Sequence, residues 1–255
     1  MQIAGIQKLT LVDFPGHVAA TIFTRGCSFR CGFCHNPELV LPEKFNPLLS
    51  EAQIFEFLES RYGKLTGICI TGGEPLLNVD CDKFISHLKA LGFDVKLDTN
   101  GSFPERLAKI IKDGDVDYIA MDIKSSLQKY AMTISNYQLS ISNKFSNKKL
   151  KTDQLTGNWK LETGNLQSNI LKSIRLIMSS GIDYEFRTTV CHPLHQVTDF
   201  EEIGKMIKGA KRYFIQNYKK SKQVDETENY QPFSDKELKE AKKIMEKYVE
   251  EVGVR

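Results

Sequence analysis

Residues 18–37 read Val18-Ala-Ala-Thr-Ile-Phe-Thr-Arg-Gly-Cys-Ser-Phe-Arg-Cys-Gly-Phe-Cys-His-Asn-Pro37. The apolar run Val18–Thr24 predicts a buried strand that ends where a loop with three cysteines begins. Cys27, Cys31 and Cys34 have the spacing C-x3-C-x2-C. Three thiolates fill three of the four corners of a cubane iron–sulfur cluster, whereas electron-transfer clusters use four. One iron would therefore keep an open position for a substrate or cofactor.

Composition and charge are typical of a globular protein. The 255 residues suffice for one large domain, and 41% of them are hydrophobic. A formal net charge of +3 is too small to indicate binding to nucleic acid or to a membrane surface. No signal-peptide pattern and no run long enough to span a bilayer is evident. We therefore expect a cytoplasmic protein whose six cysteines are reduced.

Strand patterns and helix patterns alternate along the chain. Strands are expected at Val18–Thr24, Leu65–Thr71, Phe93–Asp98, Asp117–Ile123, Tyr184–Val190 and Arg212–Tyr218. Helices are expected at about residues 50–63, 80–91, 104–113, 166–180, 199–209 and 234–252. This alternation predicts an α/β fold with a parallel sheet covered by helices. Six strands suit a partial (βα)6 TIM-like barrel with outer helices better than a closed eight-stranded barrel.

One segment, residues 125–164, interrupts this alternation and is rich in Ser, Asn, Lys and Thr. Loops of that length inside a domain are usually functional or mobile. The segment is either a tolerated surface insertion or an element that covers the site or docks a partner, with Trp159 as its large anchor. We predict a single domain over residues 1–255 with a loop insertion at 125–164.

Each motif that could carry chemistry follows a predicted strand. After the cysteines come Thr71-Gly-Gly-Glu-Pro75, Leu97-Asp-Thr-Asn-Gly101, Met121-Asp-Ile-Lys124, Arg187-Thr-Thr-Val-Cys-His192 and Gln216-Asn-Tyr-Lys219. In βα barrels the carboxyl ends of the strands build the active site. We therefore expect the six motifs to surround one pocket.

Residues of these motifs suit a ligand that carries both an amino group and a carboxylate. Asp98 and Asp122 could hold a cation or an amino group, and Lys124 and Arg187 could hold a carboxylate. Gly72 and Gly73 would let a ligand approach the backbone, and Glu74 could bind an ammonium group. Taken singly, Gly-Gly-Glu-Pro could be a simple turn, and Lys124 could be a solvated surface residue. The two aspartates could cap the helices that follow them.

The cysteine spacing, with the aromatic Phe33 before the third cysteine and with Gly-Gly-Glu at 72–74, resembles the radical S-adenosylmethionine superfamily. Within it the chain resembles the activases of glycyl-radical enzymes, most closely those of anaerobic ribonucleoside-triphosphate reductase. The motifs that carry this resemblance are Gly5-Ile-Gln-Lys-Leu-Thr-Leu-Val-Asp-Phe-Pro-Gly16, Thr24-Arg-Gly-Cys27, Cys34-His-Asn-Pro-Glu38, Leu97-Asp-Thr-Asn-Gly101, Met121-Asp-Ile-Lys124 and Tyr213-Phe-Ile-Gln-Asn217. They cover nearly the whole chain apart from 125–164.

The resemblance implies one [4Fe–4S] cluster on Cys27, Cys31 and Cys34, with S-adenosylmethionine bound at the open iron. Reduction would split S-adenosylmethionine into methionine and a 5′-deoxyadenosyl radical, which abstracts hydrogen from a glycine of a partner enzyme. It implies that this partner is anaerobic ribonucleoside-triphosphate reductase and that the electron donor is a flavodoxin or a ferredoxin. The implied cofactor contacts are Phe33, Gly72, Gly73, Glu74, Asp98, Thr99, Asn100, Asp122, Lys124 and Arg187.

Other interpretations explain less of the sequence. Cys31-Gly-Phe-Cys34-His35 matches the c-type haem pattern C-x-x-C-H, but this pattern leaves Cys27 unexplained. A zinc site needs a fourth ligand, and His35 is adjacent to Cys34. Cys191-His-Pro-Leu-His195 could suggest a second metal, although a loop is favoured because no further ligand pair is near. A superfamily enzyme that acts on a small molecule, similar to a deazaguanine synthase, is the main alternative.

Overall fold

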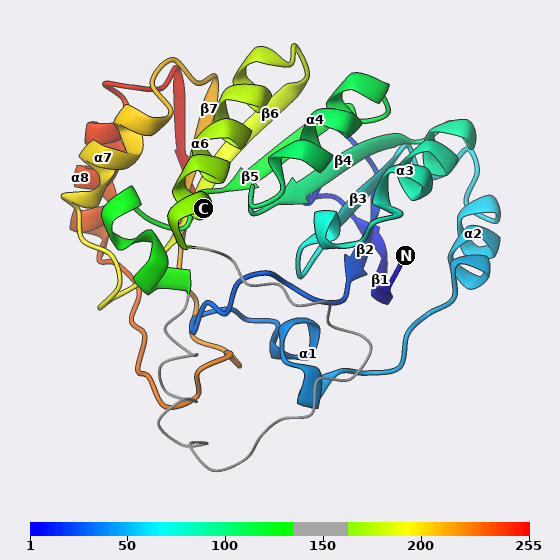
Figure 1. Cartoon of the computed structure of the whole chain (residues 1–255), viewed down its shortest axis with the longest axis horizontal. Helices are drawn as coiled ribbons and strands as arrows, with labels where there is room; N and C mark the ends of the chain where they lie inside the picture. The colour runs from blue at the N-terminus through cyan, green and yellow to red at the C-terminus, as the bar shows by residue number, and fades with distance from the viewer. Residues whose placement is uncertain (135–162) are drawn as a thin grey trace.

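The computed structural model describes residues 1–134 and 163–255. Their strands form one eight-stranded sheet in which neighbours follow chain order (Figure 1). The strands are β1 (Ile3–Thr10), β2 (Ala19–Thr24), β3 (Gly67–Gly72), β4 (Asp94–Thr99), β5 (Tyr118–Asp122), β6 (Asp183–Val190), β7 (Arg212–Asn217) and β8 (Glu251–Val254). Only β1, among these strands, runs antiparallel to its neighbour; β2 to β8 are parallel. The sheet is open, with β1 and β8 as its described edges.

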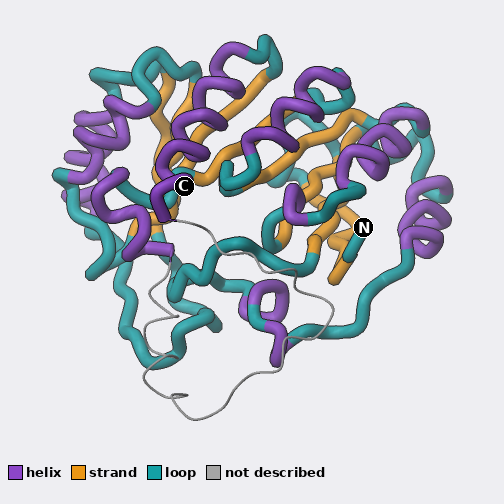
Figure 2. Tube along the Cα trace, viewed as in Figure 1, coloured by secondary structure: helices purple, strands orange, loops and turns teal. Residues whose placement is uncertain are grey.

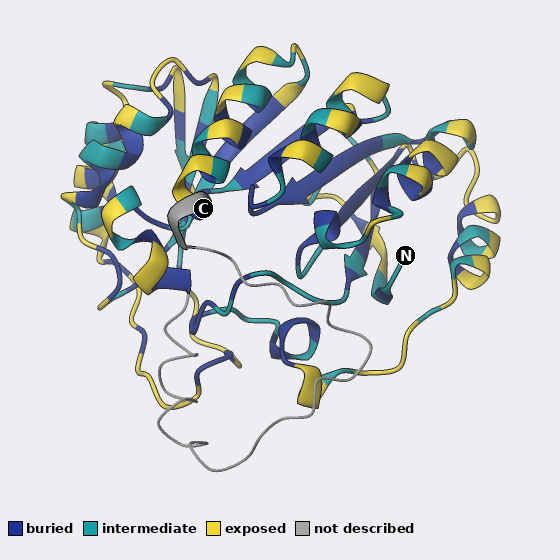
Figure 3. Ribbon diagram, viewed as in Figure 1, coloured by how far each residue is buried: buried dark blue, intermediate teal, exposed yellow. Residues whose placement is uncertain are grey.

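Amphipathic helices cover the sheet and bury one face each (Figure 3). The helices are α1 (Pro37–Val40), α2 (Glu51–Glu59), α3 (Cys81–Ala90), α4 (Pro104–Asp113), α6 (Thr163–Ser179), α7 (Asp199–Met206) and α8 (Asp235–Met245), with 3-10 turns η1 (Pro42–Lys44) and η2 (Pro75–Leu77). Capping boxes at Ser50 and Ser234 fix the starts of α2 and α8. No helix in the described ranges combines the length and the apolar character that crossing a bilayer requires.

The expected α/β fold with an open, mostly parallel sheet is confirmed, and the six expected strands are β2 to β7. Two strands were not expected, so the sheet has eight strands rather than six. The last helix was expected to continue to Val252, but α8 ends at Met245 and Val252 lies in β8. The chain turns because Tyr248 and Val249 both donate backbone hydrogen bonds to the Met245 carbonyl, and β8 then pairs with β7.

Most of the predicted 125–164 insertion, including Trp159, lies outside the described residues. The part that the structure describes is built into the fold rather than looped out. Residues 127–134 are helical, and Tyr130 is fully buried with its hydroxyl accepting from the Lys124 backbone N–H at 3.3 Å. At the other boundary, α6 already begins at Thr163.

The two ends of the parallel strands differ in character. At the amino ends Phe14 forms an apolar cluster with Ala19, Tyr118 and Ala120. At the carboxyl ends lie the cysteine loop, residues 25–36, and the β7–α8 connection, residues 218–234 (Figure 2). These two loops pair, since the Val224 N–H donates to the Cys34 carbonyl at 3.0 Å. The cysteine loop therefore lies at the carboxyl ends of the parallel strands, as the strand-end motifs predicted.

Candidate active site

The cysteine loop is joined to the end of β3 through the glycine pair. Gly73 N donates to the Thr24 carbonyl at 2.9 Å, and Glu74 N donates to the Gly26 carbonyl at 2.7 Å. A Cβ atom on Gly73 would lie only 1.9 Å from the Gly26 oxygen, so no other residue fits without moving the loop. The glycine at this position is thus required by backbone packing, independently of any ligand.

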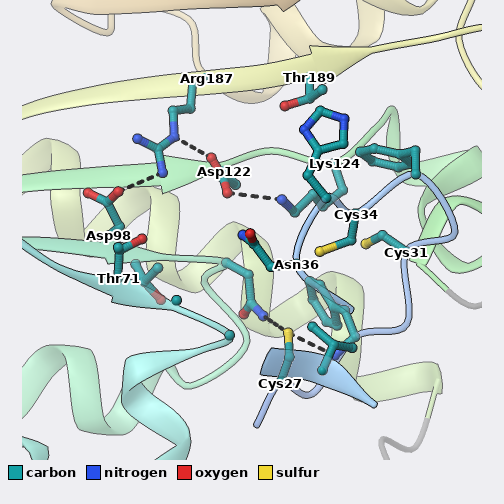
Figure 4. Close-up of a pocket in the computed structure, with 18 residues that line it drawn as sticks. Cys27, Cys31, Cys34, Asn36, Thr71, Asp98, Asp122, Lys124, Arg187 and Thr189 are labelled. Carbon is teal, nitrogen blue, oxygen red and sulfur yellow. Dashed lines mark hydrogen bonds and ion pairs between the residues drawn. The ribbon is translucent and has the colours of Figure 1, made fainter. Parts of the chain in front are cut away.

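Cys27, Cys31 and Cys34 line one side of a cavity at the carboxyl ends of the strands (Figure 4). The other lining residues are Phe29, Phe33, His35, Asn36, Val40, Thr71, Gly72, Gly73, Asp98, Thr99, Asn100, Asp122, Lys124, Arg187 and Thr189. The structure therefore brings together residues of five of the six predicted motifs; the sixth, at the end of β7, contributes none of the lining residues. Glu74 is the only predicted site residue that does not line the cavity.

Burial keeps the three thiols protonated unless a cation binds. It raises the pKa of Cys27 to about 12, and it raises the pKa of Cys31 and of Cys34 as well. The Lys124 ammonium acts in the opposite direction on Cys31 and Cys34. Within the two described ranges, no three His, Cys, Asp or Glu side chains are placed to hold a single metal ion.

Opposite the cysteines, charged side chains of alternating sign form a chain across the strand ends (Figure 4). Arg187 donates to Asp98 at 2.9 Å and also to Asp122, and Lys124 donates to Asp122 at 2.9 Å. Lys96, two residues before Asp98 in β4, extends the chain by donating to Asp98.

The chain of charges fixes the ionisation state of its members. Burial opposes ionisation, but the neighbouring Arg187 and Lys124 hold the pKa of Asp122 well below its usual range. Arg187 and Lys96 do the same for the pKa of Asp98, again against burial. Among the members that line the cavity, the two cations Arg187 and Lys124 balance the two carboxylates Asp98 and Asp122.

Glu74 is fully buried and does not line the cavity; its carboxylate is bonded to the end of β4 and to the β4 loop, residues 100–103. One carboxylate oxygen accepts from the Thr99 hydroxyl at 2.8 Å and from the Leu76 N–H at 3.1 Å, and the other accepts from the Asn100 N–H at 2.6 Å. Burial raises the pKa of Glu74 to about 7, although these three donors favour the ionised form. Its visible role is to join the end of β3 to the end of β4.

Several lining residues were not predicted from the sequence. Thr71 and Thr189 lie within β3 and β6, where a threonine is also an ordinary strand residue. Asn36 and His35 follow the last cysteine, and the His35 Nε2 is buried without a hydrogen-bond partner. Lys96 does not line the cavity but pairs with Asp98; it was missed because a lysine in a strand suggests an exposed face, whereas this one is 2% exposed. Its position two residues before Asp98 was the available signal.

The family model of the radical SAM superfamily matches residues 21–210. The chain belongs to the radical S-adenosylmethionine superfamily. Its enzymes use a [4Fe–4S] cluster and S-adenosylmethionine, and this chain is such an enzyme. Along 255 aligned residues it is 31% identical to a protein of Methanocaldococcus jannaschii whose name assigns it to the glycyl-radical enzyme activating enzymes. The match covers 99% of this chain and 95% of that protein, so the chain belongs to this group.

Other relatives match over part of their length. A pyruvate formate-lyase-activating enzyme of Listeria monocytogenes is 32% identical over 135 residues, which are 48% of this chain and 53% of that enzyme. The structure of Streptococcus suis SuiB bound to S-adenosylmethionine matches this chain with a TM-score of 0.57 and 14% identity. The match covers 89% of this chain and 48% of the SuiB chain. TYW1 with a lysine-pyruvate adduct matches with a TM-score of 0.54 and 15% identity, covering 90% and 73%. These two structures share the radical S-adenosylmethionine fold.

The residues of the cavity fit the superfamily's cofactors. Thiols are the ligands that iron–sulfur clusters require, and three of them face the same cavity. The paired carboxylates and cations opposite them match a ligand with an amino group and a carboxylate, and Phe29, Phe33 and Val40 offer apolar surface for an adenine ring.

Proposed function

We propose that this chain is an activating enzyme that forms a glycyl radical on anaerobic ribonucleoside-triphosphate reductase. The observation that carries the proposal is the placement of three cysteines opposite the Asp98–Arg187–Asp122–Lys124 chain in a single cavity. When bound and reduced, the cluster supplies the electron that releases a 5′-deoxyadenosyl radical from S-adenosylmethionine, and this radical removes hydrogen from the partner's glycine. Cys27, Cys31 and Cys34 hold the cluster in this proposal.

The charged chain would bind the amino acid end of S-adenosylmethionine. In the structure its charges neutralise one another, so a zwitterionic ligand can replace internal partners without leaving a charge unpaired. Lys124 and Arg187 would take the carboxylate, and Asp98 and Asp122 the amino group. Thr99, Gly72 and Gly73 would contact the same end, and Phe33 would lie beside the adenine. Glu74 and Asn100 would support these contacts through the β4 loop.

We propose further that residues 1–255 form one domain, that a flavodoxin or ferredoxin supplies the electron, and that no nucleic acid or membrane takes part. A location in the cytoplasm fits such a reduced donor. The relative from Methanocaldococcus jannaschii supports the kind of partner, because its name refers to glycyl-radical enzymes. The motifs at 5–16 and 97–101 support the reductase as the partner.

The test begins with anaerobic reconstitution and assays of iron and sulfide. We expect about four irons per chain and release of 5′-deoxyadenosine after reduction with S-adenosylmethionine. Cys31→Ala should abolish both, whereas the control Cys81→Ala, at a buried cysteine outside the cavity, should retain both. If Cys31→Ala retains the cluster, the cysteine assignment is wrong.

The partner is tested by adding anaerobic ribonucleoside-triphosphate reductase and recording the glycyl-radical EPR signal. A signal that depends on S-adenosylmethionine supports the proposal. Release of 5′-deoxyadenosine without any glycyl radical would favour the alternative, an enzyme that acts on a small molecule.

A further inference from the structure

The loop after β6 contains His195, whose ring is buried between two backbone segments. The side chain is 1% exposed. Its Nε2 lies 2.8 Å from the Lys124 carbonyl oxygen, and its Nδ1 lies 3.2 Å from both the backbone nitrogen and the carbonyl oxygen of Cys191. Both ring nitrogens are thus engaged by the chain itself, which leaves neither for a metal ion.

These contacts determine where the ring carries its proton. A carbonyl oxygen can only accept, so the Nε2 must donate to Lys124. In the neutral ring the Nδ1 then accepts from the Cys191 N–H, while the Cys191 carbonyl accepts from the His195 backbone N–H at 3.0 Å. Burial lowers the pKa of His195, which favours the same neutral form. The shorter contact, to the Lys124 carbonyl, therefore assigns the single proton of the neutral ring to Nε2.

The ring of His195 also contacts the cysteine loop. It meets the Phe33 ring edge-on, with centroids 6.1 Å apart and planes at 80°. Phe33 lies between Cys31 and Cys34 and lines the cavity. One imidazole therefore contacts the cysteine loop on one side and the end of β5 on the other.

At the end of β5, the contact bears on the Lys124 side chain. The Lys124 N–H donates to the Tyr130 hydroxyl at 3.3 Å, and its carbonyl accepts from His195, so the residue is held on both sides. The ammonium can then reach Asp122 at 2.9 Å, inside the cavity (Figure 4). Without the histidine, the carbonyl of Lys124 would lose its buried donor.

We propose that His195 is a positioning residue for S-adenosylmethionine, because it contacts both Lys124 and Phe33, two residues that line the cavity. This inference rests on the proposed function of the cavity. His195 itself does not line the cavity, so it acts through these two residues and touches neither cofactor.

Three variants of the reconstituted protein test the proposal: His195→Leu, His195→Gln and, as a control, His192→Gln. Leucine removes the donor and the acceptor, so we expect about a tenfold loss of affinity for S-adenosylmethionine with iron content unchanged. In His195→Leu, S-adenosylmethionine should therefore change the EPR spectrum of the reduced cluster less than it does in wild type. Glutamine can donate and accept from similar positions and should restore most of the affinity. His192 is 38% exposed and pairs with Glu237, so its variant should match wild type.

Wild-type affinity in a folded His195→Leu variant would overturn the proposal, as would a His195→Gln variant as weak as the leucine one. If His195→Leu does not fold, the affinity of His195→Gln for S-adenosylmethionine still tests the proposal. Nitrogen-15 NMR of histidine-labelled protein gives an independent readout, and it should show a proton on Nε2 and none on Nδ1 of His195. The opposite tautomer contradicts the proposal. A wild-type protein that binds no S-adenosylmethionine would instead refute the proposed function, while the tautomer would be unaffected.

Discussion

Asn100 connects the end of β4 to the cysteine loop through an amide whose orientation is fixed. Its Oδ1 accepts from the Ser102 N–H at 3.0 Å, so its Nδ2 is left to donate. The Nδ2 lies 3.1 Å from the Ser28 hydroxyl and 3.6 Å from the Cys27 sulfur. A second donor, the Phe29 N–H, lies 3.4 Å from the same sulfur. Cys27 thus has two N–H groups directed at its Sγ.

Hydrogen bonds to a cluster's sulfur ligands favour the reduced form, because that form carries more negative charge. We therefore expect Asn100→Ala to lower the reduction potential of the bound cluster. A bond of about 1 kcal/mol corresponds to a shift of up to about 40 mV for one electron. Spectroscopic redox titration of the reconstituted protein measures it.

The control for Asn100 is Ser28→Ala, which removes the other acceptor of the amide and leaves the sulfur contact in place. Its potential should remain at the wild-type value. A potential for Asn100→Ala that is equal to or higher than wild type would show that the amide does not tune the cluster.

Glu74 gives a second prediction at the scale of one residue, Glu74→Gln. Three donors converge on its two carboxylate oxygens, so an amide must place its NH2 group against the Thr99 hydroxyl and Leu76 N–H or against the Asn100 N–H. We expect a loss of about 2 kcal/mol in stability, seen as a thermal midpoint lower by about 4–8 °C. An unchanged midpoint would mean that these buried bonds contribute little.

The sequence predicted which residues belong to the site, but not all of the contacts that these residues make. Asp98, Asp122 and Arg187 could be placed together because parallel strands end on the same edge of a sheet. The sequence could not show that Glu74 is bonded to the end of β4 instead of lining the cavity, since two of its donors lie 25 and 26 residues away along the chain. Lys96 was hidden for a related reason, because its burial depends on Asp98 as a partner.

At the scale of elements, the backbone after β3 approaches the cysteine loop closely at Gly73. Gly73→Ala must push the loop away, because its Cβ would overlap the Gly26 carbonyl. We expect a loss of at least about 2 kcal/mol in stability and a lower iron content after reconstitution. Both can be measured by thermal unfolding and by iron assay.

Gly5 in β1 is the matched control for Gly73. A Cβ there meets nothing within 4 Å, and its backbone is not left-handed. Gly5→Ala should therefore change stability by less than about 0.5 kcal/mol and leave the iron content unchanged. Equal effects of the two substitutions would rule out the close approach at Gly73 as the cause.

The elements that could be predicted are those with a strong periodic pattern. Strands β2 to β7 are buried and flanked by helices, so each gives a short apolar run with a clear end. Strand β8 has four residues, and Val252 also continues the apolar spacing of α8, so the sequence favoured a longer helix. In β1, residues Gln7, Lys8 and Leu9 are exposed and give no alternation to follow.

For the molecule as a whole, the candidate active site and the apolar cluster around Phe14 lie at opposite ends of the parallel strands. Phe14 lies at the amino ends, where it is 2% exposed and packs against Tyr118, with ring centroids 6.1 Å apart. It also covers Gly67, the first residue of β3. The cavity with the cysteines is at the carboxyl ends of the same strands.

Phe14→Ala should therefore reduce stability and spare catalysis. Removing the ring leaves a void under the strands, which costs about 3–5 kcal/mol if the surroundings do not collapse into it. Phe14→Leu keeps much of the volume and should cost less than half as much. At a temperature where both variants are folded, iron content and 5′-deoxyadenosine release per folded chain should equal wild type, because no cavity residue is altered. A loss of cofactor cleavage in a folded, iron-loaded Phe14→Ala protein would show that packing at the amino ends is coupled to the geometry of the cysteine loop.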